Sequence, residues 1–193
     1  MKYQIIGQTV PVVELELNKG ETVYTQRGGL CYETDGIVMK TNARGGVMKS
    51  LGRMLTGESI FMANYTADRD GAKIAFATTV PGNIIPFNLT ERPSGLVVQK
   101  GSFLCAEDDV ETSVTFSKKI GAGLFGGEGF ILQKVTGNGT VFLEVDGDPI
   151  EKELMPGEVL KVDTGNVVAF ETTVTYTIET VSYTHLTLPT TSR

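Results

Sequence analysis

Short alternating runs of apolar and polar residues, cut by Gly, Pro, Asn and Asp, make up most of this chain. Residues 10–17 predict a strand that ends in a turn at 18–21, and residues 140–145 predict another that ends at 146–149. Residues 167–178 are rich in β-branched and aromatic side chains. Runs of roughly four to eight residues, with a turn every eight to twelve, are typical of a β-sandwich or barrel. The pattern therefore predicts an all-β fold.

Two blocks of the chain repeat the same plan of strands and turns. Residues 55–61 return as 125–131, at an offset of 70 that carries Glu58 onto Glu128. Residues 101–107 return as 165–171, at an offset of 64 that carries Glu107 onto Glu171. Recurrence at a fixed spacing indicates a repeated structural unit. We predict one domain built from two pseudo-repeats, at about 8–107 and 108–181.

Residues 40–55 break the strand pattern. Their apolar residues fall at the spacing of one helical face, namely Val47, Met48, Leu51, Met54 and Leu55. Glycines at positions 45, 46 and 52 disfavour a long helix. The segment is predicted to form one short helix or a helical loop.

The same segment is a candidate contact surface for a partner or a membrane, because four cations accompany its apolar face in an acidic chain. They are Lys40, Arg44, Lys49 and Arg53. Basic amphipathic segments lie on anionic membranes or dock in grooves of other proteins. The alternative is that the apolar side packs on the sandwich and the cations are solvated.

Composition and charge narrow the class of protein. The chain is 40% apolar and 21% charged, which is typical of a soluble globular protein, and its net charge is −6. Phosphate backbones are held mainly by Lys and Arg, so we do not expect nucleic acid among its partners. No apolar run suits a signal peptide or a membrane span, which predicts a cytoplasmic protein. Cys31 and Cys105 lie in apolar runs and are predicted to be buried thiols.

Residues 182–193 differ from the rest of the chain. They contain neither glycine nor an acidic residue and extend no repeat. They resemble translated sequencing-adapter DNA, and the alternative is a real terminal segment. We predict a non-native tail and place the single β domain at 1–181.

Sequence motifs for catalysis or cofactors are weak. Gly121, Gly123 and Gly126 form a G-x-G-x-x-G, but a polar run precedes it and a predicted strand follows it, so it does not fit a dinucleotide site. The one histidine, His185, lies in the predicted tail. Without histidines, neither a histidine metal site nor a nucleophile–base pair is available. We therefore expect no metal, no cofactor and no catalytic residue.

The glycine-rich repeat elements allow two interpretations. Glu58 and Glu128 each follow a glycine, within the group Gly57, Gly126, Gly127 and Gly129. Two carboxylates that meet across a pocket can perform general acid–base catalysis. The alternative, which we favour, is that each glutamate closes a turn by bonding backbone amides, at a repeat turn or subunit contact.

Residues 121–129 and 155–171, together with 101–106 and 44–46, resemble the protein family named for altered inheritance of mitochondria. The resemblance covers about residues 8–181. It implies a β-rich fold like that of the tryptophan RNA-binding attenuator protein, a double-stranded β-helix, and a homo-oligomer. Its mitochondrial branch is linked to inner-membrane organisation. The family offers no agreed catalytic residues.

Three functions stay open at this point. The leading hypothesis is a non-enzymatic scaffold or interaction protein with a protein partner or a peripheral membrane contact. The second is a small-ligand-binding β module with a pocket between β layers. The third is a carboxylate enzyme that uses Glu58 and Glu128.

Overall fold

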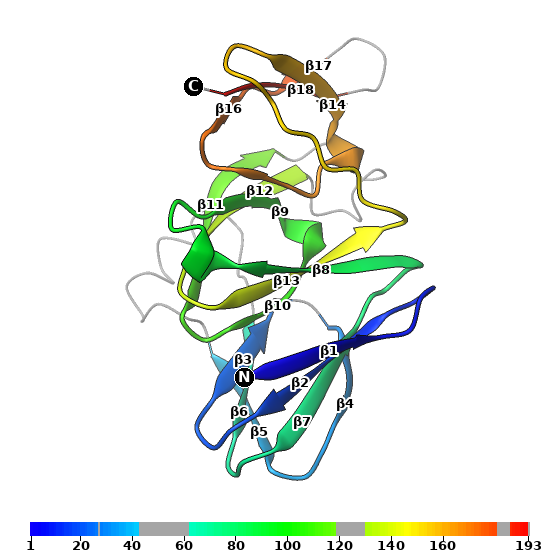
Figure 1. Cartoon of the computed structure of the whole chain (residues 1–193), viewed down its shortest axis with the longest axis vertical. Coiled ribbons are helices and arrows are strands. Elements are labelled where there is room, and N and C mark those ends of the chain that lie inside the picture. The colour runs from blue at the N-terminus through cyan, green and yellow to red at the C-terminus, as the bar shows by residue number, and fades with distance from the viewer. Residues whose placement is uncertain (27, 43–61, 119–129, 181–185, 193) are drawn as a thin grey trace. The chain divides into compact units, whose positions relative to one another are not determined.

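The computed structural model describes residues 1–26, 28–42, 62–118, 130–180 and 186–192 (Figure 1). In these residues the regular structure is β-strand, with three one-turn 3-10 helices. The helices are η1 (Leu89–Glu91), η2 (Lys100–Ser102) and η3 (Thr164–Asn166). The predicted all-β class is confirmed. The chain divides into two compact, interleaved units.

The first unit comprises Met1–Phe87, Phe103–Asp109 and Gly139–Asp148. It contains two sheets whose strands pair antiparallel. The four-stranded sheet has the order β1 (Lys2–Ile6), β2 (Val12–Leu17), β7 (Ala72–Ala77), β4 (Leu30–Glu33). The six-stranded sheet has the order β5 (Ile37–Asn42), β6 (Met62–Ala67), β3 (Thr22–Thr25), β10 (Phe103–Glu107), β13 (Thr140–Asp146), β8 (Gly82–Asn88).

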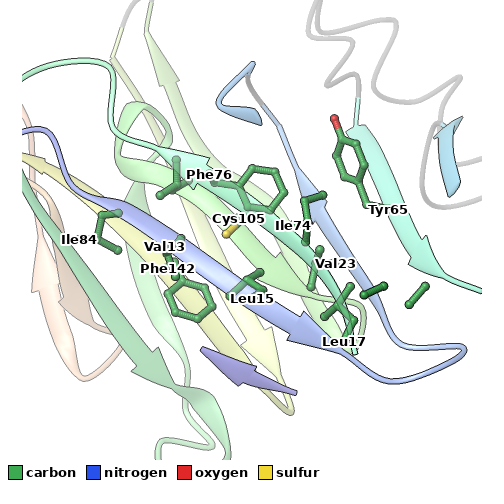
Figure 2. Packing of buried hydrophobic residues seen from close by; sticks show 13 residues of the cluster. Val13, Leu15, Leu17, Val23, Tyr65, Ile74, Phe76, Ile84, Cys105 and Phe142 are labelled. Carbon is green, nitrogen blue, oxygen red and sulfur yellow. The ribbon is translucent and has the colours of Figure 1, made fainter. Parts of the chain in front are cut away.

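Strand alternation builds the core of the first unit. On β2, Val13, Leu15 and Leu17 are fully buried, whereas the glutamates between them face outward. This is the period of two that a half-buried strand requires. Figure 2 shows these side chains packed with Phe76 of β7 and Phe142 of β13.

The second unit comprises Asn88–Ser102, Val110–Asn138 and Pro149–Arg193. One of its sheets has the order β11 (Val110–Lys118), β12 (Phe130–Gly137), β9 (Leu96–Gln99), β15 (Ala169–Glu171). Another has the order β14 (Val159–Asp163), β18 (Leu186–Ser192), β16 (Val174–Tyr176), and β17 (Glu179–Thr180) also pairs with β18. Val97, Phe130 and Leu132 form one of its buried apolar clusters, packed against Phe116 and Phe170.

The strand pairings repeat with the offsets seen in the sequence. The order β5-β6-β3-β10 in the first unit matches β11-β12-β9-β15 in the second. Tyr24 of β3 lies opposite Asn64 and Ala106, and Val97 of β9 lies opposite Lys134 and Phe170. Between the two sheets, one partner shifts by 70 residues, from Asn64 to Lys134, and the other partner shifts by 64 residues, from Ala106 to Phe170. The two sheets are therefore copies of one arrangement.

A third, partial copy follows the same plan. Along the chain, the order of elements β14, η3, β15, β16 repeats the order β9, η2, β10, β11. The order β16-β18-β14 matches β11-β12-β9. A strand from the next copy along the chain pairs with each copy: β10 of the second copy pairs with β3 of the first, and β15 of the third copy pairs with β9 of the second. This exchange of strands explains why the two units interleave. The boundaries of the two predicted blocks, and the origin of residues 182–193, stay predictions.

Two expectations from the sequence need correction. Lys40, at the start of the predicted helix, lies in strand β5 opposite Asn64, because its neighbours extend the β5–β6 ladder. Residues 43–55 lie outside the described part of the chain. Cys105 is buried as predicted, but Cys31 is exposed, because it lies on β4 at the edge of its sheet.

Candidate interaction surface

The outer face of the four-stranded sheet carries a polar cluster centred on Glu14, which we call the Glu14 cluster. Alternation on β2 directs this carboxylate away from the core. Gln4 Nε2 and Lys73 Nζ each donate to Glu14 Oε1 at 2.8 Å, from the neighbouring strands β1 and β7. The hydroxyl of Tyr32, on β4, donates to Glu14 Oε2. One carboxylate thus connects all four strands.

Hydrogen bonds to the Glu14 carboxylate lower its pKa to about 2, with Lys73 the largest cause, then Tyr32 and Gln4. The same contact with Glu14 raises the pKa of Lys73 and the pKa of Tyr32. Each group is therefore held in its usual charge state at neutral pH. The arrangement favours a fixed structural cluster over a proton-transfer site.

Glu14→Gln should reduce the acid sensitivity of the protein. The folded-state pKa of Glu14 lies below its ordinary value of 4.5, so the carboxylate stabilises the folded state above that value. This contribution is lost as the pH falls from about 4.5 toward about 2. Urea midpoints measured across this window should fall more for the wild type than for Glu14→Gln. Parallel curves would show that the Glu14 contacts do not persist in solution.

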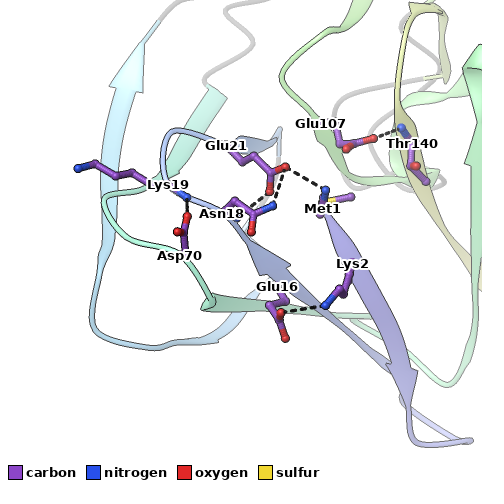
Figure 3. Close-up of polar contacts among 9 residues, drawn as sticks. All are labelled: Met1, Lys2, Glu16, Asn18, Lys19, Glu21, Asp70, Glu107 and Thr140. Atoms are coloured by element: carbon purple, nitrogen blue, oxygen red, sulfur yellow. Dashed lines mark hydrogen bonds and ion pairs between the residues drawn. The ribbon is translucent and has the colours of Figure 1, made fainter.

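A second set of polar contacts closes the turn before β3 (Figure 3). Glu21 Oε2 accepts from the backbone N–H of Asn18 at 2.7 Å, and Glu21 Oε1 lies 3.0 Å from the Met1 amine. Nearby, Asp70 Oδ1 accepts from the backbone N–H of Lys19 at 2.7 Å. Desolvation opposes ionisation of Glu21, but the donors outweigh it and lower its pKa. The glutamate acts as a turn clamp.

The same clamp recurs before β14. Glu158 Oε2 accepts from the backbone N–H of Met155 at 2.9 Å, three residues earlier, as Glu21 does from Asn18. In both turns a glycine with φ above +80° precedes the glutamate, at 88° in Gly20 and 83° in Gly157. A Gly-Glu pair therefore closes turns by backbone hydrogen bonding at these two places.

The predicted site residues fall mostly outside the described residues. Lys40 is exposed on β5, and its carbonyl accepts from Asn64 Nδ2 at 3.4 Å. The other nine are Arg44, Lys49, Arg53, Gly57, Glu58, Gly126, Gly127, Glu128 and Gly129. Their proposed grouping stays a prediction.

Exposed apolar side chains lie on β4 and β5, which end the orders of two different sheets, and sequence reasoning missed them. Leu30 and Tyr32 are 41% exposed, Val38 is 42% exposed and Met39 is 56% exposed. The sequence showed apolar strands here but gave no sign that each would end its sheet among the described strands. Large apolar side chains exposed on an edge strand are candidates for contact with another molecule.

Neither a cluster of metal-ligating side chains nor a membrane-spanning helix occurs in the described residues. They contain no group of three or more His, Cys, Asp or Glu side chains placed to hold a metal ion. No helix among them is long and apolar enough to cross a membrane. His185 lies outside these residues.

Known proteins resemble the chain over nearly its whole length. The family model described as mitochondrial biogenesis AIM24 matches residues 3–191. An uncharacterised protein of Streptococcus pyogenes serotype M6 is 32% identical over 176 residues, which are 87% of this chain and 69% of that protein. The crystal structure of protein SPYM3_0169 from Streptococcus pyogenes superposes with a TM-score of 0.77 at 24% identity, covering 99% of this chain and 89% of that one. At this identity the structural match shows the fold alone.

Proposed function

We propose that this chain, which belongs to the mitochondrial biogenesis AIM24 family, is a non-enzymatic scaffold or interaction protein. The observation that carries the proposal is the exposure of apolar side chains on the edge strands β4 and β5, with Met39 56% exposed and the exposed cation Lys40 next to it in the sequence. The Glu14 cluster supports it, because its groups are held in ion pairs and hydrogen bonds. A sandwich or double-stranded β-helix arrangement of the sheets and a cytoplasmic location belong to the same proposal.

An anionic membrane surface is the contact that the charge pattern favours. Lys40 extends from an exposed apolar strand, and Arg44, Lys49 and Arg53 follow in the sequence. Cations beside apolar side chains bind anionic lipid by combined electrostatic and apolar contact.

Flotation with phosphatidylserine-containing vesicles tests the membrane contact. At low salt the protein should float with the vesicles, and a variant with glutamine at positions 40, 44, 49 and 53 should not, because salt and charge removal weaken the same attraction. A matched control replaces Lys2, Lys19, Lys134 and Lys152, which changes the net charge equally. Absence of wild-type binding at low salt, or equal loss in both variants, would contradict the membrane contact.

Gln133 favours a small-ligand-binding module as the second candidate function. Its side chain is fully buried on β12, and within the described residues neither amide atom has a hydrogen-bond partner. Ala63 and Leu188 occupy the equivalent positions of the other two sheets by register, so the amide is peculiar to this copy. A buried polar group of this kind suits an internal polar ligand or water.

Gln133→Leu should stabilise the protein by about 1–3 kcal/mol, because a buried amide without partners retains its desolvation cost. The urea midpoint measures the gain, and Gln133→Met, which keeps the length of the side chain, should show the same sign. A loss of stability in both variants would mean that the amide has a partner. A thermal-shift screen of metabolites on wild type and Gln133→Leu would then identify ligands that need the amide.

A further inference from the structure

Three Asp-Gly pairs in the chain share a reactivity that the fold distributes unequally. They are Asp35-Gly36, Asp70-Gly71 and Asp146-Gly147. In such a pair the backbone nitrogen of the glycine can attack the side-chain carboxyl group of the aspartate, because glycine has no Cβ to obstruct the ring that forms. The folded structure decides which glycine nitrogen reaches its carboxyl group.

Backbone hydrogen bonds hold two of the three pairs. The N–H of Gly71 donates to the carbonyl of Leu17 at 2.9 Å, and the N–H of Gly147 donates to the carbonyl of Pro81 at 3.0 Å. The carboxylate of Asp70 is itself fixed by a backbone N–H at 2.7 Å (Figure 3). Attack by either glycine nitrogen would first have to break its hydrogen bond, which leaves a carbonyl without its partner. Both pairs are therefore protected in the folded protein.

The pair Asp35-Gly36 is arranged differently. It lies in the turn between β4 and β5, where the Asp35 side chain is 97% exposed and Gly36 has a φ of 99°. The carbonyl of Gly36 accepts from the N–H of Asp68 at 2.9 Å, which holds the turn. The N–H of Gly36, by contrast, bonds to the carboxylate of Asp35. The two groups that would react are therefore already in contact.

Arg69 restrains this pair in two ways. Its Nη2 lies 2.6 Å from Asp35 Oδ2, and its Nε and Cγ fill the space that a Cβ would take at Gly36. The hydrogen bond and charge of Arg69 lower the pKa of Asp35, and an ionised carboxylate is a poor target for a nucleophile. The Arg69 side chain is 52% exposed and also lies 3.7 Å from Asp68 Oδ1. Because exposed ion pairs are weak, the restraint is partial.

We propose that Asp35 is a site of self-modification, where the chain rearranges to isoaspartate through a cyclic succinimide at a rate that Arg69 restrains. The nitrogen of Gly36 bonds to Cγ of the protonated Asp35 carboxyl group, the Cγ–OH bond breaks and the nitrogen loses its proton, so one water molecule leaves. A solvent water then opens the ring. Hydrolysis of the new bond restores aspartate, whereas hydrolysis of the original peptide bond leaves Cγ in the main chain as isoaspartate.

Isoaspartate at this position lengthens the main chain by one carbon between two exposed edge strands. The turn is held by the Gly36 carbonyl and by the N–H of Thr34, which donates to the carbonyl of Lys73 at 2.8 Å. The added carbon shifts these groups relative to each other, so the rearrangement loosens the connection between β4 and β5. The proposal goes beyond the proposed function and does not depend on the membrane contact.

Ageing of the folded protein tests the site. The wild type is incubated at pH about 5, where a fraction of aspartate carboxyl groups is protonated, and is then digested. Electron-transfer fragmentation of the peptides should find isoaspartate accumulating at Asp35 and not at Asp70 or Asp146. In urea, which removes the folded contacts, all three positions should rearrange at similar rates. Equal rearrangement at the three positions of the folded protein, or none at Asp35 while the unfolded chain reacts, would overturn the proposal.

Arg69→Gln tests the restraint. Without the cation the Asp35 carboxyl group is protonated more often at pH about 5, so its rearrangement should be several-fold faster than in the wild type. Lys2→Gln, which removes an exposed cation elsewhere, should leave the rate unchanged, and Asp35→Ser should abolish the signal. Circular dichroism shows that each variant is folded. A folded Arg69→Gln protein that rearranges no faster than Lys2→Gln would contradict the role of Arg69.

Discussion

Phe142→Ala should destabilise the protein by about 3–5 kcal/mol, the cost of emptying the space of a large core side chain. Phe142 is fully buried in the core of the first unit and packs edge-on against Tyr3, with ring centroids 5.0 Å apart. Its strand, β13, lies next to β10, so the surrounding backbone cannot easily collapse into the cavity. The change in urea midpoint, followed by circular dichroism, measures the loss.

Ile150→Ala is the matched control, because this apolar side chain is 83% exposed and its truncation should leave stability almost unchanged. If Phe142→Ala cost no more than Ile150→Ala, the core of the first unit would be wrongly described.

Gly82→Ala should cost roughly 3 kcal/mol or prevent folding, although it adds a single methyl group. A Cβ on Gly82 would lie 1.9 Å from the carbonyl oxygen of Val145 and 2.8 Å from the backbone nitrogen of Gly147. Both atoms belong to backbone, which cannot rotate aside as a side chain does. The yield of soluble protein and the urea midpoint report the effect.

Gly28→Ala is the control for this substitution. A Cβ at Gly28 meets nothing within 4 Å, and its φ lies outside the left-handed region. The free energy of unfolding of Gly28→Ala should stay within about 0.5 kcal/mol of that of the wild type, as it does for most surface substitutions. A tolerated Gly82→Ala would mean that β8 and β13 lie farther apart than described.

The repeat was predictable because strand spacing is encoded locally. The matches of Glu58 to Glu128 and of Glu107 to Glu171 gave the two offsets that relate the strand pairings of the sheets. The third, partial copy was marked by the offset of 64, which carries residues 101–107 of the second copy onto 165–171 of the third, but both offsets were attributed to a single pair of blocks. The resemblance to the family was also correct.

Exposure of β4 could not be predicted from its own residues. Cys31 and Cys105 lie in similar apolar runs, and both were expected to be buried. Cys105 is covered because β3 pairs with its strand, whereas β4 has no described strand in that position. Burial of a strand depends on neighbours far away in sequence, which the local pattern does not specify.

The contacts of Glu14 were missed for the same reason. Alternation on β2 predicts an outward carboxylate, but Lys73 and Tyr32 reach it only after three strands have paired. The turn clamp was easier to foresee, because Glu21 and Glu158 find their amide donors three residues away.

Hydrogen exchange at the backbone amide of Glu33 tests most directly whether the exposed edge strand β4 is an interaction surface. Uncovered strand amides exchange quickly, and pairing with a second strand protects them. The account predicts fast exchange at Glu33 in the free protein and protection in the presence of phosphatidylserine-containing vesicles, with Ala106 slow throughout. Exchange at Glu33 that is equally slow or equally fast with and without vesicles would contradict it.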